Sequence, residues 1–514
     1  MKPSQILNRV KIRAGGKCPL KTRPISTGKI AVPLRKIPCL DFSVPFLERF
    51  SAERLLKNEV SLLHSTEAMD WSASWSFSNR SALWNYNLHY FEYLFPLLRA
   101  WQNTGERKYL DKTIEMISGW ISAPLSVTKP GRAAYPTAIR MVSWITWYGY
   151  VEHALDEEFK AVFLNSLFEQ YSFLSEHLEK DILGNHYYED LKALVIASLF
   201  FDEEAMLSET LECFRNECRE QILPDGVHYE RSPMYHNLIL EGLLRVVISL
   251  RGRNRQDQEL ELYAKRMMDA AWSLQSGLDR IPLFHDCGNN VSKPLSALVE
   301  CGRRYLSIVP QTRSVFPCGG YVRLEYGQWT LLVDASAPGP DYQPGHAHSE
   351  AMSFELFCNG KPVIVNCGTF AYQCEERVFF RSTLAHNTVM ADHEEQSACW
   401  SVFRVGARAR VSVLEADPSC LRMQMTDQKG TVVERCMAFR PEKQCLLICD
   451  EAQGHFLESA VHGAVSRCSS ESKCEELSVP YAVDYGQTEQ IPALVFSGRD
   501  RVEIKIDLKE PEVL

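Results

Sequence analysis

Hydrophobic positions in roughly the first three hundred residues recur at the spacing of an α-helix. Between residues 84 and 101, Leu88, Phe91, Phe95 and Leu98 fall three or four positions apart. The same spacing predicts helices over 84–101, 110–121, 141–154, 159–178, 189–201, 235–250 and 260–278. Consecutive helices joined by short turns predict an all-α region of stacked helical hairpins.

Near residue 310 the period of the hydrophobic pattern changes to two. Short alternating segments predict strands over 321–324, 329–334, 352–357, 362–366, 431–439, 444–450 and 502–508. Asn359-Gly360 lies between two of them and supplies the two positive φ angles of a type I′ hairpin turn. We therefore expect an α+β chain with a basic lead-in (1–40), a helical domain (41–310) and an antiparallel β-sandwich (311–514).

Composition and charge exclude several classes of protein. The 514 residues are 45% hydrophobic, which supports a large buried core and excludes a disordered chain. The formal net charge of −9 argues against a nucleic-acid partner and against bulk binding to anionic surfaces. No stretch approaches the roughly 18 apolar residues of a membrane-spanning helix, so no integral membrane segment is expected.

The first forty residues have an unusual charge distribution, with ten Lys or Arg and no Asp or Glu. No apolar segment with a small-residue cleavage site follows, so we expect no signal peptide and a cytoplasmic location, with unconventional export as the alternative. The segment is interpreted as a solvated lead-in, and a weak anchor to an anionic surface remains open. The 17 cysteines include no C-x-x-C pair, which excludes zinc-ribbon and thioredoxin motifs and favours reduced thiols.

Four windows concentrate polar and aromatic side chains: 184–189, 225–236, 344–350 and 377–388. The first is also explained as a helix start, with Asn185 as the cap and Glu189 in the first turn. The second is also explained as a solvated loop. In the third, His346 and His348 share a face if the chain is extended, as a metal site or an acid–base pair requires.

The fourth window carries Arg377 and Arg381, which either hold a carboxylate bidentately or form ordinary surface pairs. Phosphate-binding, dinucleotide-binding, serine-hydrolase and H-E-x-x-H motifs do not occur, and no organic cofactor is expected. Asp225, Glu230 and Asp286 are candidates for the paired carboxylates of a glycoside hydrolase, but their spacing does not test this.

Taken in order, these windows resemble the heparinase II/III family of polysaccharide lyases. The matching segments are 84–90, 134–137 with Arg140, 184–189, 225–236, 345–348 and 381–388. The resemblance implies an N-terminal incomplete (α/α) toroid followed by a β-sandwich, with the active site in the cleft between them. It also implies β-elimination at a 4-linked uronic acid.

The resemblance implies roles for individual residues as well. Asn185 would bind the uronate carboxylate, Tyr235 would transfer the proton, and His346 would share the acid–base work. Residues that would bind substrate around them are His186, Glu189, Tyr229, Arg231, His236, Arg377 and Arg381. Tyr229 is the rival of Tyr235. Because a free tyrosine titrates near 10, a basic Tyr235 needs nearby positive charge, for which Arg231, His236 and the histidines of the third window are candidates.

Some members of the family hold a structural zinc in the sandwich through His, Asp and His. The matching positions are His348, Asn366 and His386, so zinc is a possible cofactor. Asn366 stands where a carboxylate is expected, and a neutral amide oxygen brings no charge to offset Zn²⁺. The sequence therefore leaves zinc binding open.

The net charge also bears on the substrate. An excess of acidic residues argues against an extremely sulfated polymer such as heparin and favours a less charged uronate-containing poly- or oligosaccharide, such as an exopolysaccharide. Two other functions stay open: a catalytically inactive carbohydrate-binding or exopolysaccharide assembly protein, and a glycoside hydrolase on the toroid. The oligomeric state stays unknown.

Overall fold

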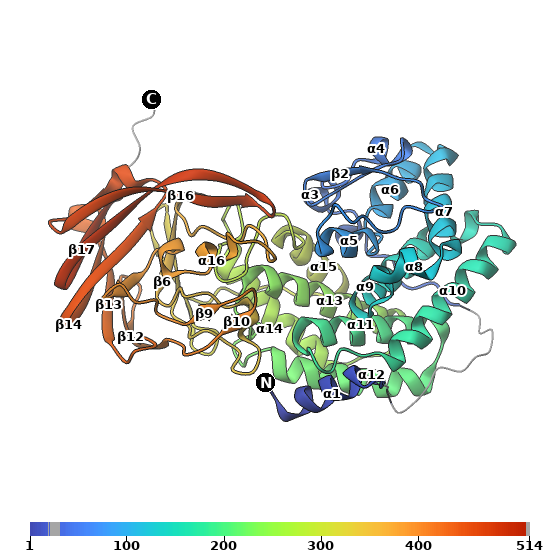
Figure 1. Ribbon diagram of the computed structural model, residues 1–514, viewed down its shortest axis with the longest axis horizontal. Helices are drawn as coiled ribbons and strands as arrows, with labels where there is room; N and C mark the ends of the chain where they lie inside the picture. Colours follow the sequence, from blue (N-terminus) through green and yellow to red (C-terminus); the bar gives the residue numbers. More distant parts are fainter. Residues whose placement is uncertain (19, 21–30, 510–514) are drawn as a thin grey trace. The chain divides into compact units, whose positions relative to one another are not determined.

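The computed structural model describes residues 1–18, 20 and 31–509, which form two compact units (Figure 1). The first unit consists of Met1–Glu220, Ile239–Ala264 and Ser296–Val309, and the second of Gln221–Leu238, Lys265–Leu295 and Pro310–Leu514. Lys21, Arg23 and Lys29 of the basic lead-in lie outside the described residues. The first turn of the helix that carries Tyr235 thus belongs to the same unit as the sheets.

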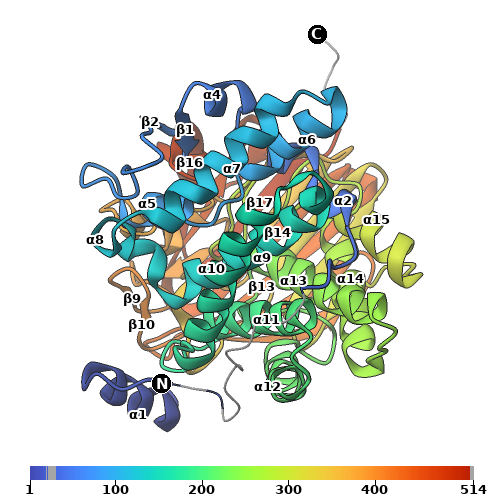
Figure 2. The same cartoon turned by 90° about the vertical axis from the view of Figure 1, so that its right-hand side faces the viewer.

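Helices dominate the chain before residue 310. They are α1 (Pro3–Arg13), α2 (Pro38–Asp41), α3 (Val44–Leu47), α4 (Ala52–Leu56), α5 (Ala82–Leu88), α6 (Leu94–Thr104), α7 (Arg107–Ser122), α8 (Leu125–Thr128), α9 (Ala134–Val151), α10 (Glu157–Glu176), α11 (Gly184–Phe201), α12 (Glu204–Gln221), α13 (Pro233–Gly252), α14 (Gln258–Gln275) and α15 (Leu295–Leu306). A short hairpin, β1 (Glu59–Leu62) and β2 (Ser65–Ala68), interrupts them. α9 packs against both α10 and α11 (Figure 2). None of the helices in the described part of the chain has the length and apolar character of a bilayer-spanning segment.

A buried arginine ties together two segments that the family resemblance singled out. Arg140 on α9 donates from Nη1 to the carbonyls of Gly131 at 2.7 Å and His89 at 3.3 Å. Its guanidinium lies 4.0 Å from the ring centroid of the buried Trp120. A Cβ on Gly131 would lie 2.2 Å from the His89 ring, so only glycine permits this approach. These residues therefore fix the local fold of the first unit.

The single helix predicted over 84–101 is wrong. The structure divides it into α5 and α6 at Phe91, whose φ is +60°. A positive φ is strained for a residue with a side chain. Phe91 accepts it because its ring then packs on Trp75 and Trp144, with centroids 5.5 and 5.3 Å away. Burial of aromatic surface outweighs the local helical preference here.

Two antiparallel sheets dominate the second unit. The five-stranded sheet has the order β3 (Val315–Phe316), β4 (Tyr321–Tyr326), β5 (Trp329–Asp334), β6 (Ser353–Cys358) and β7 (Lys361–Ile364). The eight-stranded sheet has the order β11 (Arg410–Ala416), β12 (Cys420–Thr426), β13 (Val432–Arg440), β14 (Cys445–His462), β17 (Gln487–Asp507) and β15 (Cys468–Ser469), with β16 (Lys473–Asp484) on β17 and β8 (Val389–Ala391) on β14. The predicted type I′ hairpin joins β6 to β7, and Asn359 and Gly360 have φ of 49° and 81°.

The two sheets contribute to one hydrophobic core. Leu331 and Phe354 from the five-stranded sheet lie in the same buried cluster as Met423, Ile448 and Ile504 from the eight-stranded sheet. The predicted order, a helical N-terminal region followed by an antiparallel sheet region, is confirmed. The closer descriptions as a toroid and a sandwich, and the boundaries at 40 and 310, stay predictions.

The segment that leads into α13 is fixed to the second unit by side-chain hydrogen bonds. Asp225 Oδ2 accepts from the backbone N–H groups of residues 318 and 319 at 2.7 and 2.8 Å. Ser232 Oγ accepts from the backbone N–H of Tyr235 at 3.3 Å and donates to the carbonyl of Asp286 at 2.6 Å. Ser232 thus caps the helix and also fixes its first turn to the Asp286 loop.

A buried ion pair inside the second unit gives a testable consequence. Arg435 on β13 forms two hydrogen bonds of 2.6 and 2.8 Å with Asp450 on β14, and its Nη1 donates to the carbonyls of Met352 and Asn387. Arg435→Met leaves Asp450 charged and unpaired in the interior, which we expect to cost about 3–5 kcal/mol of unfolding free energy. Chemical denaturation followed by circular dichroism measures the loss.

Arg422 on the neighbouring strand β12 is the matched control. It is 48% exposed at the side chain, and its nearest carboxylate lies 3.6 Å away, so Arg422→Met is expected to cost less than about 1 kcal/mol. Equal stability losses in the two variants would contradict a structural role for the buried pair.

Candidate active site

The carboxylate of Asp286 is the centre of a buried polar cluster in the second unit. Arg377 holds it with two parallel hydrogen bonds, of which that from Nη2 to Oδ2 measures 2.7 Å. His346 Nδ1 donates to Oδ2 and His348 Nε2 to Oδ1, each at 2.8 Å. Thr369 Oγ1 lies 3.4 Å from Oδ1. Four side chains from three segments of the chain therefore converge on one anion.

Electrostatics keep that anion ionised. Burial by itself would raise the pKa of Asp286, but the Arg377 guanidinium and the hydrogen bonds from His346 and His348 lower it well below its usual range. A permanently ionised Asp286 accepts the Nδ1 proton of His346, which leaves Nε2 as the nitrogen that can exchange a proton with a ligand. Asp286 thereby sets both the orientation and the tautomer of His346.

Tyr235 lies directly beside His346. Their ring centroids are 4.1 Å apart with an interplanar angle of 34°, and the Tyr235 hydroxyl is 3.0 Å from that of Tyr372. Burial, followed by Tyr372 and Asp286, raises the pKa of Tyr235 well above its usual value. Tyr235 is therefore a neutral phenol, the form that donates a proton.

The two candidates from its own segment for positive charge near Tyr235, Arg231 and His236, are both engaged with the backbone. Arg231 donates from Nη1 to the carbonyl of Ala337 at 2.8 Å. His236 contacts backbone through both nitrogens: Nδ1 accepts from the N–H of His228 and Nε2 lies 2.9 Å from the carbonyl of Met267. Burial lowers the pKa of His236 to about 4, so it is neutral.

Arg377 and Arg381 are buried, with 2% of each exposed. Arg377 is engaged with Asp286 and, through Nε, with the carbonyl of Val402 at 3.2 Å. Arg381 donates to the carbonyls of Ala347 at 3.0 Å and Ser401 at 2.9 Å. Both guanidinium groups thus hold the loops around His346 in place.

Aromatic side chains that sequence reasoning missed complete the surroundings of His346. The Tyr372 backbone N–H donates to the hydroxyl of Tyr485, which lies in the turn between β16 and β17. The Phe403 ring centroid is 5.5 Å from that of Tyr372 and 5.9 Å from that of His346. No short sequence motif indicates these residues, because they reach the site from separate loops.

Tyr229, the alternative to Tyr235 as the proton-transfer residue, shares a hydroxyl contact of 3.3 Å with Tyr342.

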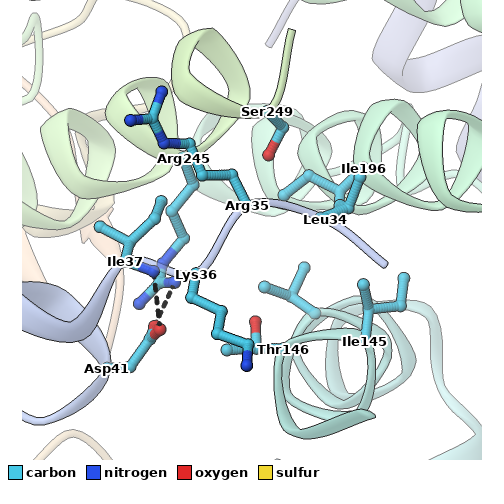
Figure 3. Close-up of a pocket in the computed structure, with 11 residues that line it drawn as sticks. Leu34, Arg35, Lys36, Ile37, Asp41, Ile145, Thr146, Ile196, Arg245 and Ser249 are labelled. Carbon is cyan, nitrogen blue, oxygen red and sulfur yellow. Dashed lines mark hydrogen bonds and ion pairs between the residues drawn. The ribbon is translucent and has the colours of Figure 1, made fainter. Parts of the chain in front are cut away.

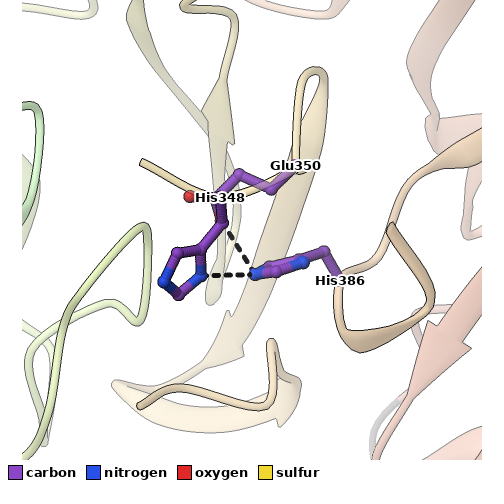
Figure 4. Close-up of side chains that lie close together, drawn as sticks. All are labelled: His348, Glu350 and His386. Atoms are coloured by element: carbon purple, nitrogen blue, oxygen red, sulfur yellow. Dashed lines mark hydrogen bonds and ion pairs between the residues drawn. The ribbon is translucent and has the colours of Figure 1, made fainter. Parts of the chain in front are cut away.

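A second polar cluster adjoins the first through His348. Potential ligand atoms of His348, Glu350 and His386 all lie within 4.8 Å of one another (Figure 4). His348 Nδ1 is 3.2 Å and Glu350 Oε2 is 3.3 Å from His386 Nε2. Burial lowers the pKa of both histidines, so they are neutral, as metal ligands must be.

Glu350, rather than Asn366, supplies the carboxylate beside these histidines. The amide oxygen of Asn366 accepts from the backbone N–H of Asn387 at 2.9 Å. Glu350 Oε2 is buried without a hydrogen bond among the described residues, whereas Oε1 pairs with His285 Nδ1 at 2.8 Å. His348 and His386 are each oriented through their other nitrogen, by Asp286 and by the carbonyl of Ser382, as metal-binding histidines generally are.

The first unit holds the other predicted site residues at the start of α11. Asn185 is 8% exposed, and its side-chain amide makes no hydrogen bond with any described residue. His186 Nδ1 lies 3.1 Å from Glu179 Oε2, and its ring packs 4.6 Å from that of Tyr135. Glu189 pairs with Lys192 one turn later, and burial raises the pKa of Glu189. An amide without a partner at a helix N-terminus is suited to bind an anion.

The first unit also has a small cavity between residues 34–37 and the helices α9, α11 and α13 (Figure 3). Its volume is about 30 Å³, and the ion pair of Arg245 with Asp41, at 2.7 Å, lies on its wall. A space of this size accommodates a water molecule but not a sugar. It is therefore not a candidate substrate site.

Comparison with known proteins identifies the family. The heparinase II/III N-terminus model matches residues 49–314, and the heparinase II/III-like C-terminal model matches residues 309–467. The chain belongs to the heparinase II/III family. The heparin-sulfate lyase of Bacteroides thetaiotaomicron is 24% identical over 469 residues, 79% of this chain and 65% of that protein. That of Pedobacter heparinus is 21% identical over 377 residues, 62% of this chain and 53% of that protein.

The chain thus spans between about half and two thirds of these curated relatives. Solved structures agree on the fold. A heparinase III crystal structure superposes with a TM-score of 0.70 at 15% identity, covering 98% of this chain and 92% of the other. A heparan sulfate lyase from Pedobacter heparinus gives 0.62 at 17% identity, with 98% and 87% covered.

Proposed function

We propose that this protein is a polysaccharide lyase that cleaves a uronate-containing polysaccharide by β-elimination. The observation that carries the proposal is the adjacency of Tyr235 and His346, with ring centroids 4.1 Å apart and His346 oriented by Asp286. An acid and a base side by side are what elimination across one sugar bond requires. Membership of the family and the two curated lyases support the same reaction.

In the proposed reaction, Nε2 of His346 removes the proton from C5 of the uronate. The electron pair of that C–H bond forms the C4=C5 double bond, and the bond from C4 to the glycosidic oxygen breaks. The phenol of Tyr235 donates its proton to the departing oxygen. The elevated pKa of Tyr235 supports the donor role, because the group is protonated at neutral pH. Tyr372 accepts or donates at the same hydroxyl and positions it.

Asn185 is proposed to bind a carboxylate group of the substrate. Its support is the unpartnered amide at the N-terminus of α11, where helix N–H groups favour negative charge. His186 and Glu189 are assigned to substrate binding on the basis of the same cluster.

The proposed substrate is a uronate polymer of low sulfation. Arg377 and Arg381, two of the arginines expected to bind substrate, are buried and engaged with Asp286 and backbone carbonyls. The net charge of −9 points the same way.

A glycoside hydrolase is less well supported. Hydrolysis needs one carboxyl group that is protonated and able to donate. Of the three candidate carboxylates, Asp286 is held ionised by Arg377 and is therefore not available as the acid. An inactive carbohydrate-binding protein is distinguished from the lyase by turnover alone.

Incubation with a panel of uronate polysaccharides, followed by ultraviolet absorbance, tests the function. Elimination leaves a conjugated double bond that absorbs, hydrolysis leaves reducing ends without absorbance, and a binding protein produces neither. We expect absorbance to rise, and faster on an unsulfated heparan backbone than on heparin. New reducing ends without absorbance, or no product from any polymer, would contradict the proposal.

Two tyrosine variants test, in the same assay, which tyrosine donates the proton to the departing oxygen. Tyr235→Phe removes the donated proton and keeps the ring, so kcat should fall about 100- to 10,000-fold with little change in KM. Tyr229→Phe, the matched control, loses the hydroxyl contact with Tyr342 and should retain its kcat. The reverse pattern would transfer the acid role to Tyr229.

We further propose that His348, Glu350 and His386 hold a structural Zn²⁺. Two zinc ligands at about 2.0–2.1 Å in tetrahedral geometry lie about 3.3 Å apart, close to the 3.2 and 3.3 Å that separate His386 Nε2 from the other two ligand atoms. Glu350 contributes the negative charge that Asn366 lacks. The ion would tie the strand after His348 to the His386 loop and takes no part in the proton transfers above.

Metal analysis of the purified protein tests the zinc site. We expect near-stoichiometric zinc in the wild type, its loss in His348→Ala and His386→Ala, and a lower melting temperature after chelation. His455→Ala, an exposed histidine paired with Asp392, is the control and should retain zinc. Metal-free wild-type protein with unchanged stability would disprove this site.

A further inference from the structure

Helix α1 (Pro3–Arg13) turns its apolar side chains toward solvent. Ile6 is 53% exposed, Leu7 70% and Val10 61%. A surface helix ordinarily buries its apolar face against the protein. Figure 2 shows α1, in dark blue, at the border of the first unit. The orientation of this helix is therefore reversed with respect to the usual pattern.

Polar groups on the opposite face attach α1 to its unit. Gln5 is buried, and its Nε2 donates to the carbonyl of Ile182 at 2.9 Å. Asn8 Nδ2 donates to the carbonyl of Lys180 at 3.4 Å. These bonds fix the rotation of the helix about its axis, so the apolar face is held outward rather than exposed by fraying.

The exposed apolar face is bordered by positive charge. At about 100° per residue, Ile6, Val10 and Leu7 fall within an arc of about 100°, with Arg13 just beyond one edge and Lys11 just beyond the other. Neither Lys11 nor Arg13 forms an ion pair with any described residue. No acidic residue occurs before Asp41, although the whole chain has a net charge of −9.

We propose that this face of α1 docks onto an anionic lipid surface. Aliphatic side chains flanked by lysine and arginine match the boundary between acyl chains and acidic headgroups, into which amphipathic helices insert in the plane of the bilayer. Each cation near such a surface strengthens binding about fivefold. The docking is peripheral and reversible, and it is independent of the sugar chemistry in the second unit.

Charge and area favour lipid over a protein partner. An 11-residue helix is about 16 Å long and about 10 Å wide, far short of the roughly 800 Å² that each partner buries in a stable protein interface. The exposed side chains are aliphatic, whereas protein hot spots favour aromatic anchors. A lipid surface needs neither a matching groove nor a larger area.

Co-sedimentation of the full chain with vesicles tests the docking. Binding is expected to phosphatidylcholine vesicles that contain phosphatidylglycerol, with little binding to phosphatidylcholine alone, and it should weaken as salt rises. Leu7→Ser should weaken binding about tenfold, and Lys11→Glu/Arg13→Glu at least as much. Leu262→Ser on α14, where Leu262 is 49% exposed, is the matched control and should bind as the wild type does.

Circular dichroism should show all variants folded, because Leu7 makes little contact with the protein. Absence of binding to the anionic vesicles, equal binding to both vesicle types, or unchanged binding of Leu7→Ser would overturn the proposal. So would self-association of the wild type, measured by sedimentation velocity without lipid and abolished by Leu7→Ser, because that result would make a second copy of the chain the occupant of this face.

Discussion

The hydrogen bonds accepted by the Asp286 carboxylate are the interactions on which the candidate site in the second unit depends. Asp286 lies on a loop between α14 and α15, accepts hydrogen bonds from His346, His348 and Arg377, and is itself fixed through its carbonyl to Ser232 at the start of α13. A buried anion is costly unless it is paired and hydrogen-bonded. Arg377 provides the pairing, and the two histidines complete the hydrogen bonding.

These hydrogen bonds link three parts of the second unit: the start of α13, the loop that carries Asp286, and the loops around His346. Ser232 caps α13 and so places Tyr235 in its first turn, next to the Asp286 loop. Asp286 orients His346, while Arg377 and Arg381 hold the loops that carry His346 and Phe403. Through His348, the same carboxylate also orients one nitrogen of the three-residue cluster with Glu350 and His386. The geometry of the proposed acid–base pair and the support of the surrounding loops therefore both depend on the side chain of Asp286.

Much of the architecture follows from the sequence because it depends on local periodicity. Six of the seven predicted helices have close counterparts, and the Asn359-Gly360 turn is found as predicted. The break at Phe91 was missed because tertiary packing on Trp75 and Trp144 overrides helical spacing. Helix α12 was missed although its buried Phe214 and Cys218 keep a helical spacing, since charged residues dilute the pattern.

For the site, the sequence singled out Tyr235 and His346, which the structure brings together. It did not single out Tyr372, and it named Asp286 only as a possible hydrolase acid. Such roles arise from contacts between segments more than fifty residues apart, which no periodicity reports. The contacts of Arg231, His236 and Arg381 with backbone carbonyls could not be foreseen for the same reason, and the substrate-binding roles of these residues stay predictions.

Steady-state kinetics of Asp286→Asn on the polymer that gives the highest wild-type rate test the central claim most directly. The amide nearly preserves shape but no longer fixes the tautomer of His346, so kcat should fall at least about 100-fold while KM stays within a few-fold and the chain remains folded. A folded Asp286→Asn protein with wild-type kcat would contradict the account.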